Sequence, residues 1–404
     1  MKKHRKFLFY TVLMIVLVLM SSCAPIGPSE SELAYTYAAQ TMTAMPTATM
    51  IPSPTGTAVP TATATQRNTA TPEPQLWPVG PENFPENVNP LTGLVVDDPS
   101  LLDRRPVLVK VANYPPSGRP HAGLSFADIV FEYYIGYGSN RFMGLYYGQN
   151  TNKIGPVRSG RLVDPKIVNM YQGILGFEGA YVTILDQIVE VLGERAISGT
   201  GNVCPAICDD GRNIVTSVFA DSEALTELSN KRGVVNEKYV LNGMVFDPQV
   251  RDGGDEGTQA NILFSSLNRG EWRFDEESGM YLRWIEDTSG NNLEMVPLVD
   301  SQTDEQLSFS NVVVLFAYYT EFTPAMHDID IWGNTTGRRA VIFRDGRAFD
   351  VTWVSARNDQ PIQFRDEDGE IFPLKPGNSW FVLFGSNSGV TTEDGAWTFN
   401  FYMP

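Results

Sequence analysis

Short runs of apolar residues, broken by polar turns, predict β-strands in the first half of the chain. Three such runs cover residues 107–113, 128–134 and 141–149, and clusters of Gly, Pro and Ser separate them. The period of the pattern then changes. Asp164 is followed by a proline and by apolar residues at helical spacing as far as Ile174, which predicts a helix with Asp164 as its N-cap.

The same spacing predicts two further helices. One covers residues 184–192, and the other covers 221–230 and is ended by Gly233. Strands and helices in this order indicate an N-terminal α/β domain over residues 81–253.

After Gly253 the chain carries strand patterns almost throughout. Three Asp-Gly pairs, at 345–346, 368–369 and 394–395, lie between apolar runs and are strong signals for hairpin turns. The fold class expected is therefore α+β, with a β-rich C-terminal domain of hairpins over residues 254–404. Strands are predicted over 262–265, 272–275, 280–285 and 311–319.

The first 22 residues have the pattern of a secretory signal peptide. Four basic residues precede an apolar run of 14 residues, and two serines follow before Cys23. Fourteen residues are too few to span a bilayer, which takes about 20. The segment Met20-Ser21-Ser22-Cys23 resembles the lipobox of bacterial lipoproteins, which implies cleavage, acyl chains on Cys23 and a lipid-anchored protein on the extracytoplasmic face of the cell membrane. The alternative is an ordinary cleaved signal with a chance cysteine.

Residues 23–80 are expected to form a disordered stalk. From 41 to 75, 11 of 35 residues are Thr, 6 are Pro and two are charged, so the stretch has little apolar surface to bury. Repeated Thr-Ala and Pro-Thr steps favour extended conformations. Such a stalk would hold a folded head away from the membrane.

The charge balance excludes one class of partner. The formal net charge is -17, and loss of the four basic residues of the signal peptide would make it -21. Binding to nucleic acid depends largely on Lys and Arg neutralising phosphates, so no nucleic-acid partner is expected. The 42% of hydrophobic residues is nevertheless enough for a sizeable folded core.

Several motifs resemble the YerB-like bacterial lipoproteins, whose two halves are domains of unknown function. The resemblance implies an envelope lipoprotein with an α/β part and a β-rich part, and it implies no reaction. Two places depart from the pattern: an insert around 203–212, which carries two cysteines, and the segment after Gly346. The motifs are Asn89-Pro90-Leu91-Thr92-Gly93, Arg105-Pro106, Arg119-Pro120, Gly123-Leu124-Ser125, Ala127 to Glu132, Arg141-Phe142, Gly155 to Ser159, Trp272, Tyr281, Arg283, Asn311-Val312, Gly346, Trp353, Gly369 and Pro376 to Trp380.

The segment from Gly155 to Arg161 delivers two guanidinium groups and a hydroxyl just before a predicted helix N-terminus. Unpaired N–H groups there favour anions, and Arg adds bidentate recognition of carboxylate or phosphate. One hypothesis is therefore a ligand site formed by Arg158, Ser159, Arg161 and Arg141. The alternative is that these arginines pair with internal carboxylates such as Asp128 or Glu132, and Asp164 would compete with an incoming anion.

Glu132 and Arg141 flank a predicted turn, so a hairpin would bring them together. A structural ion pair is one interpretation. The other makes Glu132 a general acid or base, with Asp128 or Glu178 as the second carboxylate of a glycosidase-like pair. Five tyrosines crowd the same region and suit either a core or a sugar-binding surface. They are Tyr133, Tyr134, Tyr137, Tyr146 and Tyr147.

The sequence contains few residues that could serve as metal or cofactor ligands. Beyond the signal peptide the chain has His121 and His327, and Cys204 and Cys208 would need two further ligands to hold zinc. Outside the cytosol these two cysteines are expected to form a short-range disulfide. No cofactor and no metal site are predicted.

The sequence therefore favours a non-catalytic, lipid-anchored head that binds an anionic or glycan component of the cell envelope, or an envelope protein. The competing hypothesis is an envelope-modifying hydrolase that uses Glu132. A solute-binding lipoprotein is a third candidate, but no sign of two similar lobes around a hinge supports it.

Overall fold

The structure is a computed structural model that describes residues 76–403, except 83, 202, 213, 267 and 288–293. The predicted signal peptide, Cys23 and nearly the whole stalk lie outside the described residues. Within the described part, none of the helices has the length and apolar character needed to cross a bilayer.

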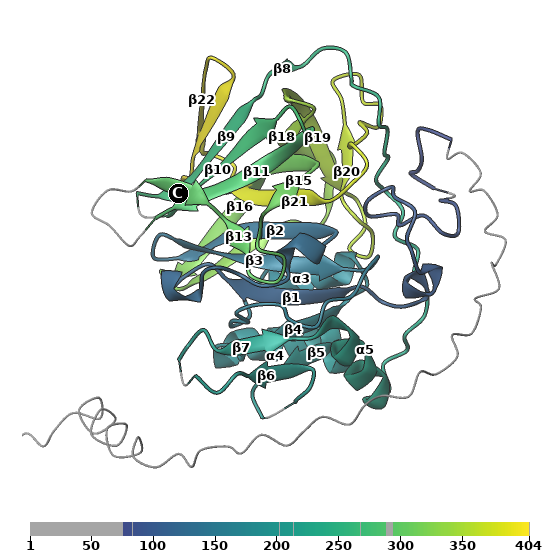
Figure 1. Ribbon diagram of the computed structural model, residues 1–404, viewed down its shortest axis with the longest axis vertical. Helices are drawn as coiled ribbons and strands as arrows, with labels where there is room; N and C mark the ends of the chain where they lie inside the picture. Colours follow the sequence, from purple (N-terminus) through teal and green to yellow (C-terminus); the bar gives the residue numbers. More distant parts are fainter. Residues whose placement is uncertain are drawn as a thin grey trace, which may run out of the picture. The chain divides into compact units, whose positions relative to one another are not determined.

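Two β-sheets form the framework of the folded part (Figure 1). The larger sheet has twelve strands, ordered β20-β19-β18-β16-β21-β2-β3-β1-β4-β5, with β17 beside β16 and β8 beside β19. Its strands are β1 (Val107–Ala112), β2 (Ile129–Gly136), β3 (Ser139–Tyr146), β4 (Ile174–Phe177), β5 (Ala196–Ser198), β8 (Asp255–Glu256), β16 (Asn311–Thr323), β17 (Met326–Asp330), β18 (Asn334–Arg344), β19 (Arg347–Ser355), β20 (Gln363–Arg365) and β21 (Ser379–Gly385).

The smaller sheet has seven strands, ordered β12-β11-β10-β9-β23-β22, with β15 beside β11. Its strands are β9 (Gln259–Ser265), β10 (Asn268–Asp275), β11 (Met280–Glu286), β12 (Met295–Pro297), β15 (Ser308–Phe309), β22 (Gly389–Glu393) and β23 (Ala396–Asn400). Two short hairpins complete the strands: β6 (Ile207–Asp209) with β7 (Val218–Ala220), and β13 (Val299–Asp300) with β14 (Glu305–Gln306). The fold is thus α+β and rich in strands, as predicted.

The large sheet continues across the position at which the two domains were expected to divide. β2 pairs in parallel with β21, with Phe131 opposite Phe381, and β21 pairs in parallel with β16. The sequence of β21 is apolar at five consecutive positions, Trp380 to Phe384, and all five are buried, because both faces of this central strand are covered. Strands from both halves therefore build one sheet.

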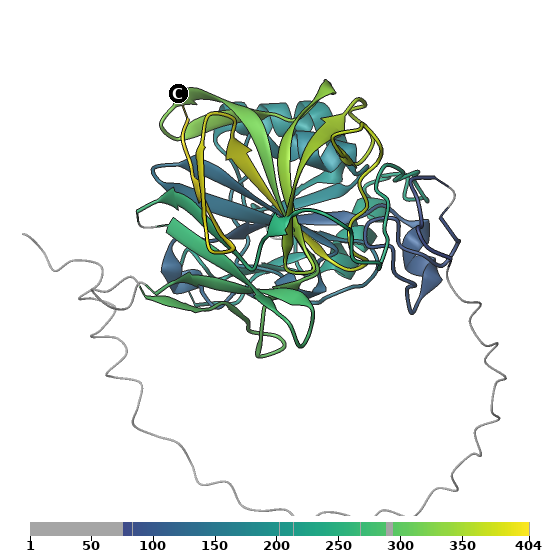
Figure 2. The same ribbon diagram turned by 90° about the horizontal axis from the view of Figure 1, so that it is seen from above.

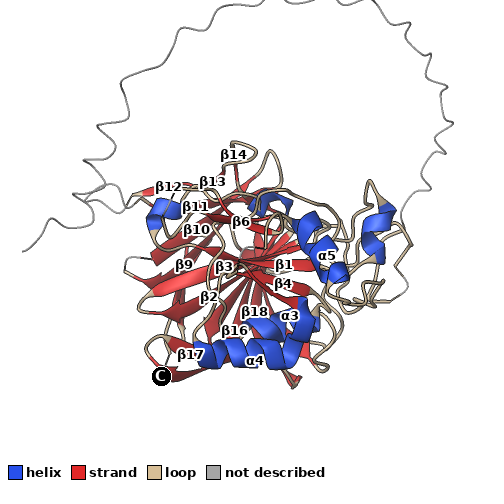
Figure 3. Cartoon of the chain, turned by 90° about the horizontal axis from the view of Figure 1, so that it is seen from below, coloured by secondary structure: helices blue, strands red, loops and turns tan. Residues whose placement is uncertain are grey.

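Each face of that sheet has its own hydrophobic core. On one face, Phe131, Leu315 and Phe381 pack with residues of α3 (Asp164–Met170) and α4 (Val182–Leu192). On the other, Val109, Val314 and Trp380 pack with the small sheet and with α5 (Ser222–Lys231). Figures 2 and 3 show the two layers of strands and the pair α3 and α4 side by side on one face.

The predicted helices form, although the first ends earlier than expected. α5 has the expected cap, since Asp221 accepts a hydrogen bond of 2.9 Å from the N–H of Ala224, and its end at Gly233 is also confirmed. The first helix was predicted to reach Ile174 but ends at Met170. Gln172 adopts a left-handed backbone with φ 53°, and the N–H of Gly173 bonds to the carbonyl of Val168, which is a Schellman ending built on glutamine.

The remaining short elements are 3-10 turns and connections. They are η1 (Pro99–Asp103), η2 (Pro116–Gly118), η3 (Leu124–Phe126) and η4 (Gly193–Arg195). The hairpin prediction at Asp345-Gly346 is confirmed, because both residues have positive φ and join β18 to β19. Asp394-Gly395 joins β22 to β23 in the same way.

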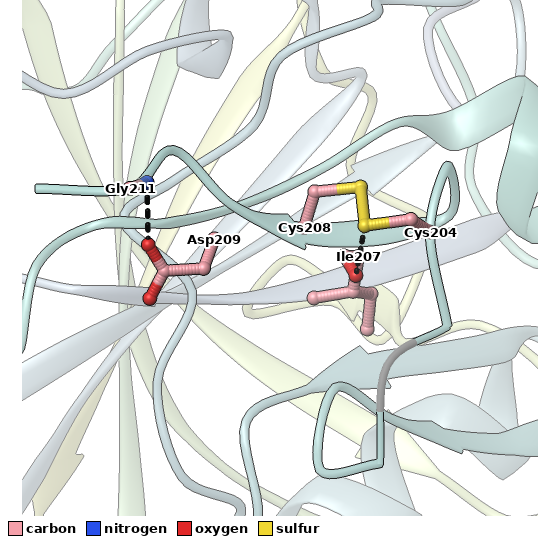
Figure 4. The surroundings of a disulfide bond; sticks show 5 residues. All are labelled: Cys204, Ile207, Cys208, Asp209 and Gly211. Atoms are coloured by element: carbon pink, nitrogen blue, oxygen red, sulfur yellow. Dashed lines mark hydrogen bonds between the residues drawn. A yellow bond between two sulfur atoms is a disulfide. The ribbon is translucent and has the colours of Figure 1, made fainter. Parts of the chain in front are cut away.

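The insert carries a disulfide between Cys204 and Cys208, whose Cα atoms lie 5.1 Å apart (Figure 4). Cys208 belongs to β6, and the next residue, Asp209, accepts a hydrogen bond of 2.7 Å from the N–H of Gly211. The β6–β7 hairpin docks on the main chain of the segment from Gly155 to Arg161, because the N–H of Val157 donates to the carbonyl of Val218 at 2.7 Å. This places the turn between β6 and β7 beside the candidate site.

Candidate functional site

The segment from Gly155 to Arg161 (the arginine segment) lies at the carboxyl ends of two parallel strands, β1 and β4. These strands pair directly only from Val107 to Val109. Beyond that point the segment enters between them: the N–H of Arg158 donates to the carbonyl of Lys110, and the carbonyl of Arg158 accepts from the N–H of Glu178, both at 3.0 Å. In open α/β sheets, the crevice outside the carboxyl ends of the strands is where ligands bind.

Three guanidinium groups gather at this edge, and each is held by a backbone carbonyl. Arg141 donates to Ser159 at 2.5 Å, Arg158 to Val215 at 3.0 Å, and Arg161 to Ala325 at 3.4 Å. The carbonyls come from the arginine segment itself, from the β6–β7 turn and from the β16–β17 turn. Carbonyl oxygens fix the position of a guanidinium group without neutralising its charge.

The charge of this cluster is not balanced by ion pairs. None of Arg141, Arg158 and Arg161 pairs with a carboxylate within the described ranges, and the buried Nε of each has no hydrogen-bond partner there. Burial, with repulsion from Arg161 and Arg158, lowers the pKa of Arg141 to about 9. Arg158 and Arg161 are partly exposed, whereas Arg141 is 5% exposed.

A buried polar cluster lies directly behind the arginines. Lys110 Nζ forms a 2.9 Å ion pair with Asp164 Oδ1, and the hydroxyl of Tyr133 bonds to both groups. Asp164 Oδ2 accepts a hydrogen bond of 2.8 Å from the N–H of Arg161. Burial lowers the pKa of Lys110 to about 7, against the raising effect of Asp164. Lys110 was not among the site residues predicted from the sequence. A lysine within an apolar strand does not indicate which carboxylate it pairs with in the folded protein.

This cluster corrects the predicted geometry of the anion site. The N-cap of the first helix is Val163, and Asp164 is its first helical residue, fully buried. The carboxylate of Asp164 already lies at this helix start, so an external anion cannot occupy the place that the sequence suggested. The main chain of Arg158 instead lies between the ends of β1 and β4, next to Glu178, the residue after β4. Burial raises the pKa of Glu178, and Arg158 opposes this effect.

The expected pairing of Glu132 with Arg141 is wrong. In the β2–β3 hairpin, Arg141 lies opposite Tyr133, so Glu132 points to the other face of the sheet. There its carboxylate accepts hydrogen bonds from Arg283 at 3.1 Å, from Trp380 at 2.7 Å and from Asn140. Burial raises the pKa of Glu132, and the Arg283 charge opposes this effect.

The expected pairing of the arginines with Asp128 or Glu132 is likewise wrong. Asp128 is 5% exposed and accepts hydrogen bonds from Asn89 Nδ2 at 2.9 Å and from the N–H groups of Tyr147 and Gly148 at 2.6 and 3.0 Å. Burial raises the pKa of this carboxyl to about 6. Glu132 itself is 1% exposed, so no substrate reaches this predicted acid in this conformation.

The five tyrosines differ in burial, and the two histidines have different hydrogen-bond partners. Tyr133, Tyr146 and Tyr147 are buried and Tyr134 is partly buried, whereas Tyr137 is 77% exposed. His121 Nε2 lies 2.7 Å from the carbonyl of Ala112. His327 Nε2 lies 3.0 Å from Glu321. In the described part of the chain, no three His, Cys, Asp or Glu side chains are grouped to hold a metal ion.

The fold and this edge define an α+β protein in which two sheets share a hydrophobic core, and in which an arginine cluster without ion pairs among the described residues lies at the strand ends. The chain belongs to the DUF3048 family, which confirms the resemblance drawn from its motifs. Residues 91–235 match the family described as "Protein of unknown function (DUF3048) N-terminal domain", and residues 260–381 match the corresponding C-terminal domain.

One similar protein is "Putative lipoprotein YerB" of Bacillus subtilis (strain 168). It is 24% identical over 305 residues, which cover 73% of this chain and 85% of the relative. The crystal structure of YerB protein from Bacillus subtilis is similar in fold, with a TM-score of 0.60 and 22% identity, and the match covers 73% of this chain and 96% of that one.

Proposed function

We propose that this protein is a lipid-anchored, extracytoplasmic binding protein and that its arginine cluster recognises a phosphate or carboxylate group on an anionic glycan of the cell envelope. The observation that carries the proposal is the set of three guanidinium groups, Arg141, Arg158 and Arg161, held by backbone carbonyls and without ion pairs among the described residues. Such a set is costly to assemble, because the guanidinium groups lose water and repel one another, unless an anion compensates it.

The geometry suits an oxyanion on a large ligand. Arg158 and Arg161 are partly exposed, and planar guanidinium groups bind phosphate and carboxylate with two parallel hydrogen bonds. Arg141 lies beneath them and adds positive potential. The Ser159 hydroxyl lies between the two outer arginines in the sequence and is the fourth ligand proposed.

Lipid anchoring rests on the sequence and on the relative. Cys23 follows a signal-like segment in a lipobox pattern, and the Bacillus subtilis relative is named as a lipoprotein. Two or more acyl chains on one cysteine hold a protein stably on a membrane, whereas one chain is marginal. The predicted stalk would then carry the arginine cluster out to the glycan.

The test is a sedimentation assay of the full-length protein, in detergent micelles, with isolated bacterial cell walls. Arg158→Ala with Arg161→Ala should weaken binding at least about tenfold, since each lost charged hydrogen bond costs about 1.5 kcal/mol or more. The control is Arg339→Ala with Arg357→Ala, which removes two exposed, paired arginines elsewhere. Unchanged binding by a folded Arg158/Arg161 variant would show the proposal to be wrong.

A second arm separates anion recognition from general adhesion. Walls from which phosphodiester polymers have been removed should lose most of the binding if phosphate is the group recognised. Walls whose carboxylates are amidated should lose it if carboxylate is recognised. Equal binding to walls treated in both ways would contradict any anion site.

A further inference from the structure

Family motifs from both halves of the chain surround a cavity that the arginine site does not use. The cavity has a volume of about 530 Å³, within the range of about 300–1,000 Å³ that is typical of small-ligand sites. Asn89 and Thr92 line it from the first motif, Asp128 from the strand motif, and Gly377 and Asn378 from the second half. Three of the family motifs therefore line the same cavity.

The walls of this cavity are fixed by hydrogen bonds across the two halves. The N–H of Gly377 donates to the carbonyl of Thr92 at 2.8 Å, and the N–H of Ser379 donates to the carbonyl of Asp128 at 3.0 Å. Asn89 is tied to Asp128 at 2.9 Å. A ligand would thus meet a preformed site, which lowers the entropy cost of binding.

The lining chemistry selects the ligand. Three carboxylates, Asp97, Asp98 and Asp128, contribute to the lining, together with the carboxamides of Gln149 and Asn150, whereas no Lys or Arg among the described residues does so. Asp97 and Asp98 are exposed at the rim, and Leu94 and Val95 add apolar surface that is 45% and 51% exposed. This surface repels anions, so it differs in kind from the arginine cluster.

We infer that this cavity binds a short peptide segment that carries a primary amine. Carboxylates at the rim attract the ammonium group, carboxamides suit the donors and acceptors of a peptide backbone, and Leu94 and Val95 pack against aliphatic carbons. Within the described ranges no aromatic side chain lines the cavity to stack on a sugar ring, which favours a peptide over a saccharide.

The test measures binding of a capped tripeptide with a central lysine to the full-length protein by isothermal titration calorimetry. Saturable binding with a Kd of about 1 mM or tighter is expected. The same peptide with norleucine in place of lysine should bind at least about fivefold more weakly, because it lacks the charge. Equal affinity for both peptides would overturn the inference, as would tighter binding of a neutral N-acetylglucosamine trimer.

Matched variants locate the site. Asp97→Asn with Asp98→Asn should weaken the lysine peptide about tenfold. Asn keeps the oxygen of Asp98 that accepts from the N–H of Ser100 at 3.0 Å, so the turn is preserved. The control is Asp186→Asn with Glu190→Gln, two exposed acids on α4. Equal loss in both variants would show a general charge effect and overturn the site.

A steric pair gives an independent check. Val95→Arg places bulk and positive charge at the rim and should abolish binding, whereas Val189→Arg, at a position of equal exposure on α4, should leave the Kd unchanged. Retained binding by the Val95 variant would also overturn the site. Neither result depends on the arginine cluster, so failure here leaves the proposed function standing.

Discussion

The indole Nε1 of Trp380 donates a hydrogen bond of 2.7 Å to Oε2 of Glu132, although 248 residues separate the two along the chain. The same carboxylate pairs with Arg283, which lies on the small sheet. One buried anion thus connects two strands of the large sheet with the sheet that covers them. Its removal would leave the Arg283 charge buried and unpaired.

We therefore expect Glu132→Ala to lower the free energy of unfolding by about 3–5 kcal/mol, the usual cost of breaking a buried ion pair. Denaturation with guanidinium chloride, followed by tryptophan fluorescence, measures this change. Glu190→Ala, on the exposed face of α4, should stay within about 0.5 kcal/mol of the parent protein. A stable Glu132 variant that had lost turnover of wall fragments would instead support the hydrolase hypothesis.

The shared sheet predicts that the two halves fold together. A chain that ends at residue 253 lacks β21 and so leaves the apolar strand β2 without its parallel neighbour. We expect this fragment to show no cooperative unfolding transition, whereas the full chain shows a single one. Circular dichroism during heating tests both. A cooperative transition in the fragment would mean that the first half has a sufficient core of its own.

Acid should destabilise the protein through His121. Burial, together with the charge of Arg119, lowers the pKa of this side chain from 6.5 to about 3. Between these values the unfolded chain binds a proton that the folded chain does not, so stability is fully present above pH 6.5 and falls as the pH falls, by up to about 1.4 kcal/mol per pH unit. Asp128, with its raised pKa of about 6, acts in the opposite direction over part of this range.

The variant His121→Gln isolates this contribution. Glutamine retains a donor for the carbonyl of Ala112 but does not titrate. Between about pH 6 and pH 4, the free energy of unfolding of the variant should therefore fall less steeply with falling pH than that of the parent protein. Parallel pH curves for the two proteins would exclude a role for His121.

The disulfide should matter little for global stability. Cys204 and Cys208 are four residues apart in the sequence. Closing so short a loop lowers the entropy of the unfolded chain, which stabilises the folded state by only about 2 kcal/mol. Cys204→Ser with Cys208→Ser is expected to lose no more than that in urea denaturation. A loss well above this value would indicate that the β6–β7 hairpin depends on the bond for its packing.

Local signals in the sequence were sufficient for most elements of the fold. Asp345-Gly346 forms its hairpin because both residues tolerate positive φ, and Asp221 and Gly233 mark the ends of α5 by side-chain capping and by a left-handed ending. These effects act over a few residues. The end of α3 was missed because Gln172 takes the position at which glycine is the usual signal.

Contacts between distant segments could not be predicted from the same patterns. Apolar runs such as β2 and β21 show that a strand is buried, but not which strand lies beside it. The partner of Glu132 was misassigned for the same reason, since Arg283 approaches from another sheet. The arginine segment was found from its composition, whereas its contacts with Val215 and Ala325 depend on tertiary structure.

The pairing of β2 with β21 also sets the order of events when the protein is made. The ribosome produces β2 some 250 residues before β21. During that interval the edge of β2 that pairs with β21 in the folded protein has no partner strand. Open apolar edges recruit other strands and promote aggregation. A protein that is exported unfolded avoids that interval, because the whole chain then becomes available for folding on the far side of the membrane.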